Sequence, residues 1–265
     1  MEKIEEKEPV VFEIEGQKLF AVMHLPLHHH HLLPGVLMCH GLAGNKTGRY
    51  RLYVHLAREL ARLGIASLRV DFRGCGDSDG EFSDATVSGF LKDAHISLQY
   101  LLKHPQIDSA RVGIFGRSFG AAIALMAANQ NSKVKSLALW SPLYDTMQWA
   151  NQWKLYHDSS TPNHVREQML RVDGQTGNYE FFNEFFKINL EQQLDELQHV
   201  PLLHIHGIKD NIIDIHHADL YEEKRKSAKA PSKFIRFAEA DHDFFHRVDQ
   251  LKAIEETANW FHKTL

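Results

Sequence analysis

The stretch that most restricts how this chain can fold is a short apolar run that turns through a serine into an alanine-rich segment. Residues 111–115 have the composition of a buried strand, and residues 121–128 that of a packed helix. Between them lies the G-x-S-x-G sequence of residues 116–120. Glycines two residues on either side of the serine keep side chains out of a tight strand-to-helix crossing, where a Cβ atom would clash. The pattern therefore predicts a sharp turn with Ser118 at its apex.

A serine at such a turn points its hydroxyl group out of the sheet, next to a helix N-terminus that favours developing negative charge. The same five-residue pattern also occurs by chance, as a serine in a glycine-rich turn. The apolar strand before Ser118 and the small-residue helix after it supply the context that the chemical interpretation requires. Ser118 is therefore a candidate nucleophile.

The rest of the chain alternates strand-like apolar runs with helix-like periodic segments. An N-terminal β-hairpin is predicted from residues 10–14 and 18–25. Further strands are predicted at residues 35–39, 65–70, 134–140, 200–206 and 233–237, and helices at 53–63, 86–103, 216–228 and 248–263. Repeated strand–helix units predict an α/β fold with a mostly parallel sheet and helices on both faces. Ligands of such sheets bind beyond the C-terminal ends of the strands.

Residues 143–197 interrupt this alternation and contain no clear strand. We interpret them as a helical cap inserted into a core formed by residues 1–142 and 198–265. The segment is rich in aromatic side chains: Trp149, Trp153, Tyr156, Tyr179, Phe181, Phe182, Phe185 and Phe186. Because ligand clefts are largely apolar and aromatic, we expect some of these side chains to line a pocket, while others pack between helix and sheet.

The composition excludes several classes of protein. A length of 265 residues suits one large domain, or a domain with an insertion. The net charge of −4 gives no basic footprint, so nucleic acid is not an expected partner. The N-terminus is charged and lacks the apolar core of a signal peptide, and no run is long enough to span a membrane. The two cysteines, Cys39 and Cys75, offer no disulfide framework, which favours a cytoplasmic protein.

Three polar residues follow predicted strands and could meet at one edge of the sheet: Ser118, Asp210 and His242. A serine hydroxyl is a poor nucleophile until a base removes its proton. Imidazole titrates near neutrality, so it can accept that proton and later deliver it to a leaving group. A carboxylate fixes the imidazole tautomer and stabilises the imidazolium that forms. We therefore predict Ser118 as nucleophile, His242 as base and Asp210 as the orienting acid.

Other residues compete for two of these roles. Asp214 lies four residues beyond Asp210, toward the next helix, so Asp210 is favoured as the acid. The rival histidines fall in the closing helix (His246), within a strand (His204) or beside the acid (His206). His242 is favoured because its loop after the last strand can reach Ser118. We expect most other histidines, including His216 and His217, to be solvated or satisfied in the core.

The loop of residues 40–48 follows a buried strand and is rich in glycine. It does not match the phosphate-binding pattern G-x-x-x-x-G-K-[ST], because Lys46 and Thr47 follow Asn45 and the glycines are misplaced. We interpret it instead as an oxyanion loop, whose exposed backbone N–H groups stabilise a developing negative charge. The predicted donors are the N–H groups of Leu42 and Phe119.

The chain has 19 histidines, four of them consecutive at His28–His31. A metal site needs ligands that converge from fixed backbone positions, which a flexible run does not supply. We therefore interpret the run as a solvated loop, and we expect neither a metal nor a cofactor. A metal protein built on the histidines is the competing hypothesis.

Taken together, these motifs resemble those of the α/β-hydrolase superfamily, in which the triad follows the same chain order of Ser, Asp and His. The motifs are residues 40–46, 71–78, 116–120, 206–210 and 241–242. The chain is most similar to small bacterial carboxylesterases of the cinnamoyl/feruloyl esterase type and to serine-aminopeptidase-like hydrolases. The resemblance covers nearly the whole chain, least well at residues 143–197. It implies the α/β-hydrolase fold and a Ser-His-Asp triad. One departure is Ala121-Ala122, where relatives often have glycine.

The predicted function is that of a cytoplasmic serine hydrolase that cleaves small-molecule carboxylic esters, with apolar or aromatic acyl groups, through an acyl-enzyme. The alternatives are a thioesterase, a serine aminopeptidase-like hydrolase and a catalytically silent binding protein. An aminopeptidase needs an acidic group to hold the substrate amine, and residues 143–197 offer Glu167, Asp173, Glu180 and Glu184. The sequence leaves the natural substrate and the oligomeric state open, a homodimer included.

Overall fold

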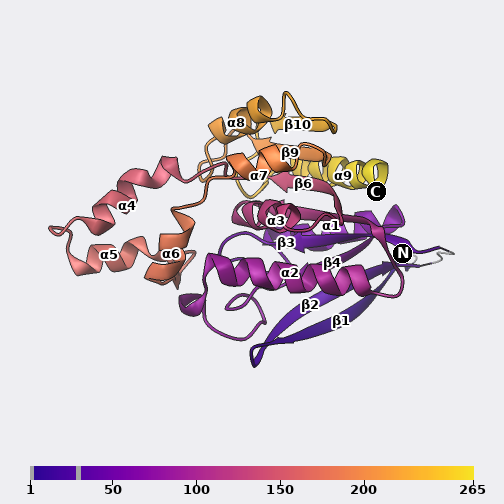
Figure 1. Cartoon of the computed structure of the whole chain (residues 1–265), viewed down its shortest axis with the longest axis horizontal. Helices are drawn as coiled ribbons and strands as arrows, with labels where there is room; N and C mark the ends of the chain where they lie inside the picture. The colour runs from indigo at the N-terminus through magenta and orange to yellow at the C-terminus, as the bar shows by residue number, and fades with distance from the viewer. Residues whose placement is uncertain (1–2, 28–30) are drawn as a thin grey trace.

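The computed structural model describes residues 3–27 and 31–265 of the chain. Within these ranges, eight strands form one sheet in the order β1-β2-β4-β3-β5-β6-β9-β10 (Figure 1). The strands from β4 to β10 in this order are parallel, while β1, β2 and β4 pair antiparallel. Their bounds are β1 Glu5–Ile14, β2 Gln17–Pro26, β3 Leu33–Cys39, β4 Ala66–Val70, β5 Ile107–Arg117, β6 Val134–Trp140, β9 Leu202–Gly207 and β10 Ser232–Phe237.

Helices cover both faces of the sheet (Figure 1). The helices α2 and α3 pack with α8 on one face, and α1 and α9 pack on the other. Within β3, Leu37 belongs to the first core, whereas Val36 and Met38 belong to the second, as the two-residue period of a strand requires. The bounds of the helices are α1 Leu52–Arg62, α2 Val87–Lys103, α3 Phe119–Asn129, α8 His216–Lys224 and α9 Arg247–Thr264, with short 3₁₀ turns η1 Arg49–Arg51 and η2 Phe82–Asp84. The predicted α/β fold class is confirmed.

Several predicted boundaries differ from those in the structure, most of all at β1, β5 and α8. Strand β1 begins at Glu5, five residues before the predicted start. Strand β5 begins at Ile107, four residues before the predicted start. Helix α8 ends at Lys224 rather than at residue 228. There the buried side chain of Arg225 donates hydrogen bonds of 2.8 Å to the carbonyls of Leu197 and Val200, which tie the chain to the segment before β9. The predicted loop at His28–His31 falls largely on residues 28–30, which lie outside the described residues.

The turn between β5 and α3 has the sharp geometry that its glycines predict. Ser118 precedes α3 with φ 56° and ψ −129°, a conformation that costs a non-glycine residue about 1–3 kcal/mol. A Cβ atom on Gly120 would lie 2.2 Å from the carbonyl oxygen of His40, and one on Gly116 would lie 2.5 Å from that of Gly120. The missing side chains thus let α3 cross directly over the end of β3. The adjacent Ala121 is fully buried and is accommodated without loss of the turn.

Residues 143–197 form helices and one small hairpin. They comprise η3 Met147–Trp149, α4 Ala150–His157, α5 Asn163–Met169, β7 Arg171–Val172, β8 Gln175–Thr176, α6 Tyr179–Phe185 and α7 Glu191–Glu196. Figure 1 shows α4, α5 and α6 lying to one side of the sheet. By contrast, Leu194 of α7 is fully buried in the same core as α3. The division into a core of residues 1–142 and 198–265 with a cap of residues 143–197 stays a prediction.

No clear strand is expected in this segment, but it contains two strands of two residues each. The strands β7 and β8 pair antiparallel, and the turn residues Asp173 and Gly174 both have positive φ, 49° and 80°. Strands of two residues are too short to show an alternating apolar pattern. The Asp-Gly pair was the one available signal, since this dipeptide favours two-residue hairpin turns.

Within the described ranges, none of the helices combines the length and apolar character needed to cross a lipid bilayer.

We expect Gly120→Ala to destabilise the protein, although alanine is the better helix former by about 1 kcal/mol. The added methyl group would collide with the backbone of His40, and overpacking of this kind costs about 1–3 kcal/mol. Thermal unfolding measures the effect. Gly64→Ala is the control, because its added Cβ meets nothing within 4 Å and only its φ of 78° opposes the change. An unfolding temperature for Gly120→Ala equal to or above the wild-type value would contradict the close crossing.

Candidate active site

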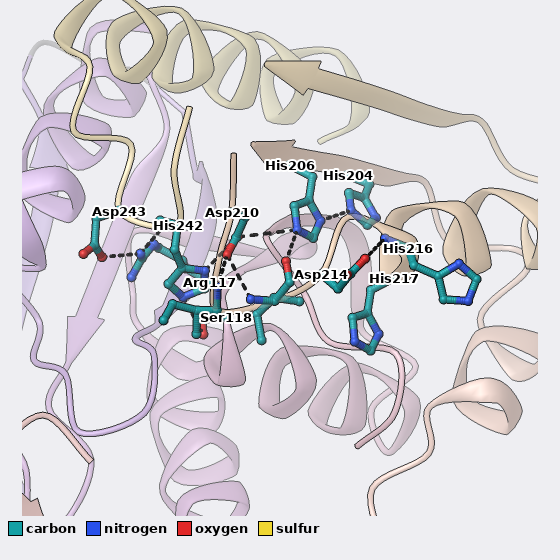
Figure 2. Close-up of polar contacts among 12 residues, drawn as sticks. Arg117, Ser118, His204, His206, Asp210, Asp214, His216, His217, His242 and Asp243 are labelled. Carbon is teal, nitrogen blue, oxygen red and sulfur yellow. Dashed lines mark hydrogen bonds and ion pairs between the residues drawn. The ribbon is translucent and has the colours of Figure 1, made fainter. Parts of the chain in front are cut away.

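Three loops at the C-terminal ends of parallel strands bring the predicted triad residues together. Ser118 directly follows β5, Asp210 follows β9 and His242 follows β10. The Nε2 atom of His242 lies 3.0 Å from Oγ of Ser118, and its Nδ1 atom lies 2.8 Å from Oδ2 of Asp210 (Figure 2). A carboxylate can only accept, so Nδ1–H donates to Asp210 and leaves Nε2 as the acceptor for the serine proton. The arrangement is able to move a proton from the hydroxyl to the ring.

The carboxylate of Asp210 is held from several sides. Its Oδ1 atom accepts hydrogen bonds of 2.9 Å from the amides of Ile212 and Ile213. Burial alone would raise the pKa of Asp210, but hydrogen bonds from His206 and His242 and the charge on His242 outweigh it. The pKa of Asp210 is therefore held well below its usual value, and the group stays ionised at neutral pH.

The imidazole of His242 is poised to be neutral. Burial, together with the nearby Arg117 guanidinium, lowers the pKa of His242, while Asp210 and Asp243 oppose the shift. A neutral ring at pH 7 is the form that can accept a proton.

Arg117 contacts the histidine loop directly. Its Nη2 atom donates to the backbone carbonyl of His242 at 2.5 Å and to Oδ1 of Asp243 at 2.6 Å (Figure 2). Neither Arg117 nor Asp243 is a predicted site residue. The position of Arg117 inside the G-x-S-x-G pattern was an available signal, but its partners are 125 and 126 residues away.

The loop after β3 lies beside the serine. A Cβ atom on Gly41 would sit 3.4 Å from Cβ of Ser118. His40 fixes this loop, because its Nδ1 bonds the Gly41 carbonyl at 2.8 Å and its Nε2 accepts from the Phe72 amide at 3.0 Å. The two predicted oxyanion donors, Leu42 and Phe119, both line the same cavity as Ser118.

The amides of the two predicted donors are available for a ligand. Phe119 is the first residue of α3, so its N–H has no acceptor within the helix. The N–H of Leu42 has no hydrogen-bond partner among residues 3–27 and 31–265. Their role as an oxyanion hole stays a prediction.

A cavity of about 640 Å³ opens above Ser118, and a second one of about 490 Å³ adjoins it. The first carries charged side chains, among them Arg49, Asp173 and Asp243. The second is mostly aromatic and aliphatic. Both cavities are lined by Leu42, Trp149, Val172, Phe185 and Ile212, and the second also by Trp153, Tyr156, Val165, Met169, Leu170, Phe182 and Phe186.

Two of the other candidates, Asp214 for the acid and His246 for the base, are bonded outside the triad. Asp214 accepts from the His216 amide at 2.8 Å, within its own turn. His246 pairs with Asp249 at 3.2 Å and is exposed. As expected, His216 is solvated and His217 is buried with a partner on each ring nitrogen.

Two buried histidines lie behind Asp210 and form a row (Figure 2). The Nε2 atom of His206 is 3.0 Å from the Ile213 carbonyl and 3.5 Å from Oδ2 of Asp210. The carbonyl can only accept, so Nε2 of His206 carries the proton and its Nδ1 accepts from Nε2 of His204 at 3.2 Å. The sequence places His206 beside the acid, but no local pattern indicates this contact. His206 thus places a second imidazole beside Oδ2 of Asp210, in addition to that of His242.

Within the described ranges, no group of three or more histidine, cysteine, aspartate or glutamate side chains is arranged to hold a metal ion.

We expect His204→Phe to flatten the pH dependence of stability below pH 6.5. Burial, together with nearby His206, holds the pKa of His204 well below its usual value. Below pH 6.5 His204 binds a proton in the unfolded chain but stays neutral in the folded chain. The free energy of unfolding therefore falls as the pH falls. The loss from this one group is at most about 1.4 kcal/mol for each pH unit.

Urea unfolding between pH 7.5 and 5 tests this expectation, with His262→Phe at an exposed position as the control. Phenylalanine keeps the ring packing of His204 against Tyr221 and Phe234. Parallel curves for wild type and His204→Phe would mean that His204 titrates normally in the fold.

Known proteins resemble this chain in sequence. The sequence model of the prolyl oligopeptidase family matches residues 52–265. An uncharacterized protein of Mycobacterium tuberculosis is 37% identical over 109 residues, which are 41% of this chain and 36% of that protein. The chain thus spans about a third of the length of that relative. The uncharacterized peptidase YtmA of Bacillus subtilis is 25% identical over 191 residues, covering 70% of this chain and 68% of YtmA.

Solved structures share the fold at low sequence identity. Est1E from Butyrivibrio proteoclasticus, with ferulic acid bound, superposes with a TM-score of 0.77 and 21% identity. The superposition covers 94% of this chain and 97% of Est1E. At this level of identity the likeness shows the fold alone.

Proposed function

The chain belongs to the prolyl oligopeptidase family within the α/β-hydrolase superfamily, and on that premise we propose that it is a serine hydrolase that cleaves carboxylic esters of small molecules. The observation that carries this proposal is the hydrogen-bonded series Ser118–His242–Asp210, with distances of 3.0 and 2.8 Å, at the floor of a cavity. Three groups of the required kinds, ordered as nucleophile, base and orienting acid, support acyl transfer.

In the proposed mechanism, Oγ of Ser118 attacks the ester carbonyl while Nε2 of His242 takes the hydroxyl proton. The amides of Leu42 and Phe119 donate to the oxyanion that forms. His242 then gives its proton to the departing alcohol oxygen, and the C–O bond breaks to leave an acyl-enzyme. A water molecule, deprotonated by His242, attacks the acyl carbonyl, and the proton returns to Ser118 as the acid leaves. Asp210 stabilises the imidazolium at each stage.

The second cavity supports a preference for an apolar or aromatic group on the substrate. It adjoins the cavity above Ser118, and its walls include Trp149, Trp153, Tyr156 and Phe186. Apolar walls favour apolar ligand groups by removing surface from water. Est1E, which shares the fold, has been solved with ferulic acid, an aromatic acid.

Peptide hydrolysis is the second candidate function, because the family is one of peptidases. Of the four acidic residues that could hold a substrate amine, Asp173 lines the cavity above Ser118. Its carboxylate, however, already pairs with Arg49 at 3.0 Å. Glu184 accepts from the amide and hydroxyl of Ser88, and neither Glu167 nor Glu180 lines the two cavities. Of these four acidic residues only Asp173 lines either cavity, which supports ester cleavage over aminopeptidase activity.

The cytoplasm is the proposed location, since two buried free cysteines suit a reducing compartment. The proposed partner is a small ester.

We expect Ser118→Ala to abolish covalent labelling by a fluorophosphonate probe and to lower ester hydrolysis by about 10⁴-fold or more. The reason is that no other group supplies the attacking oxygen. Labelling detected by mass spectrometry and turnover of p-nitrophenyl acetate measure the two effects. Ser132→Ala, at an exposed turn, is the control. A wild-type protein that is neither labelled nor active would favour the silent binding protein instead.

We expect Trp149→Ala to reduce selectivity for bulky apolar esters. Trp149 borders both cavities and its ring lies 5.6 Å from that of Phe185. The kcat/KM for a p-nitrophenyl arylpropionate should fall about 10-fold or more, while that for the acetate changes little. Leu155→Ala, an exposed apolar residue of α4, is the control. Faster turnover of acyl-CoA or of aminoacyl-anilides than of any ester would replace the ester proposal by a thioesterase or a peptidase.

A further inference from the structure

The side chain of Arg117 joins the strand that carries the nucleophile to the loop that carries the base. Arg117 is the last residue of β5 and immediately precedes Ser118. Its side chain is only 11% exposed. One guanidinium nitrogen donates to both the backbone carbonyl of His242 and the carboxylate of Asp243, at 2.5 and 2.6 Å (Figure 2). Hydrogen bonds between ionised groups are roughly twice as strong as neutral ones.

The loop between β10 and α9 is held at both ends and by turn hydrogen bonds to Asp241, and Arg117 adds a bond to the backbone at its middle. Its start is fixed by the amide of Lys209, which donates to the Ala240 carbonyl at 3.0 Å. Its far side is fixed by the fully buried ring of Phe244. Between these anchors, Arg117 is the only donor to the His242 carbonyl among the residues that the structure describes.

Asp243 provides a second connection around the mouth of the cavity. Its carboxylate is shared between Arg117 at 2.6 Å and Arg49 at 3.3 Å, and Arg49 reaches Asp173 of the β7–β8 hairpin at 3.0 Å. Arg49 and Asp173 are both more than half exposed, so their pair contributes little in water. The bonds made by the mostly buried Arg117 are therefore the stronger part of this series.

We propose that Arg117 is a positioning residue for His242, holding the backbone of the histidine loop so that the imidazole stays between Ser118 and Asp210. The proposal rests on the proposed function of the same site. It assigns a task to the residue directly before the nucleophile, whose side chain otherwise has no part in the reaction.

The same geometry gives Arg117 an electrostatic effect that a purely structural residue would lack. The charged or titratable groups around His242 are Asp210 from the loop after β9, Arg117 from β5 and Asp243 from its own loop. Arg49 lies behind Asp243, and Tyr53 of α1 lies beside Arg117 in the same cavity. The Arg117 guanidinium lowers the pKa of His242, whereas Asp210 and Asp243 raise it. Removing the cation and removing the Asp243 carboxylate should therefore shift this pKa in opposite directions.

The test compares Arg117→Met, Arg117→Lys and Asp243→Asn by steady-state kinetics across pH. Arg117→Met should lower kcat by about 10- to 100-fold with little change in KM, since misplacing a catalytic group by about 1 Å costs about 10²-fold. The acid limb of its kcat/KM profile should move to higher pH. Arg117→Lys keeps the charge but loses the planar fork, so its kcat should fall while the acid limb stays in place.

Asp243→Asn keeps the bond from Arg117 to the His242 carbonyl but removes an anion. Its acid limb should move to lower pH, with a smaller fall in kcat than in Arg117→Met. Arg111→Met is the matched control, because Arg111 is an arginine of the same strand that bonds Asp108 and the Leu32 carbonyl instead. Wild-type kcat and an unshifted acid limb in Arg117→Met would overturn the proposal, as would shifts of the same sign in both charge-removing variants.

A readout that does not use turnover separates this proposal from the proposed function. The imidazole of His242 can be titrated by NMR, and the amides of residues 241–246 can be followed by hydrogen exchange. Arg117→Met should raise the pKa of His242 and speed exchange in this loop relative to Arg111→Met. If the wild type neither labels nor hydrolyses esters, the proposed function fails, yet these two measurements still decide whether Arg117 positions the loop.

Discussion

The active site depends on the register of four parallel strands. Arg117 of β5 lies beside Trp140 of β6, Trp140 beside Ile205 of β9, and Gly207 of β9 beside Phe237 of β10. This register brings the loops that carry Ser118, Asp210 and His242 to one edge of the sheet. Residues 124 positions apart in the sequence can then approach to 3.0 Å. A shift of one strand by two residues would move its loop by about 6–7 Å and break the series.

The polar groups at this edge are almost completely removed from water, which makes their mutual contacts decisive. Ser118, Asp210 and His242 are each less than 10% exposed. Burying an isolated carboxylate costs free energy. Two backbone amides and two imidazoles stabilise the Asp210 carboxylate and offset that cost. Burial and Arg117 in turn keep the imidazole of His242 uncharged, ready to accept a proton. The same arrangement of charges therefore stabilises the loops and sets the protonation states on which the proposed chemistry relies.

Two kinds of side chain, charged and aromatic, line the rest of the site around these polar groups. Ion pairs among Arg117, Asp243, Arg49 and Asp173 follow one side of the mouth. Aromatic side chains from residues 143–197 line the adjoining cavity. Residues 143–197 thus supply the apolar walls to which the proposed function assigns substrate preference, which fits the principle that one fold serves many chemistries.

The sequence by itself determined the order of strands and helices, the sharp turn at Ser118 and the three side chains of the candidate triad. Each of these is encoded locally, by apolar periodicity, by the two glycines around the serine, or by a polar residue directly after a strand. The tertiary structure alone decided which distant groups meet: Arg117 with the His242 carbonyl, and the β7–β8 hairpin with Arg49. No local pattern could predict these contacts, because they depend on strand register and loop conformation, which arise only when segments more than a hundred residues apart pack into one core.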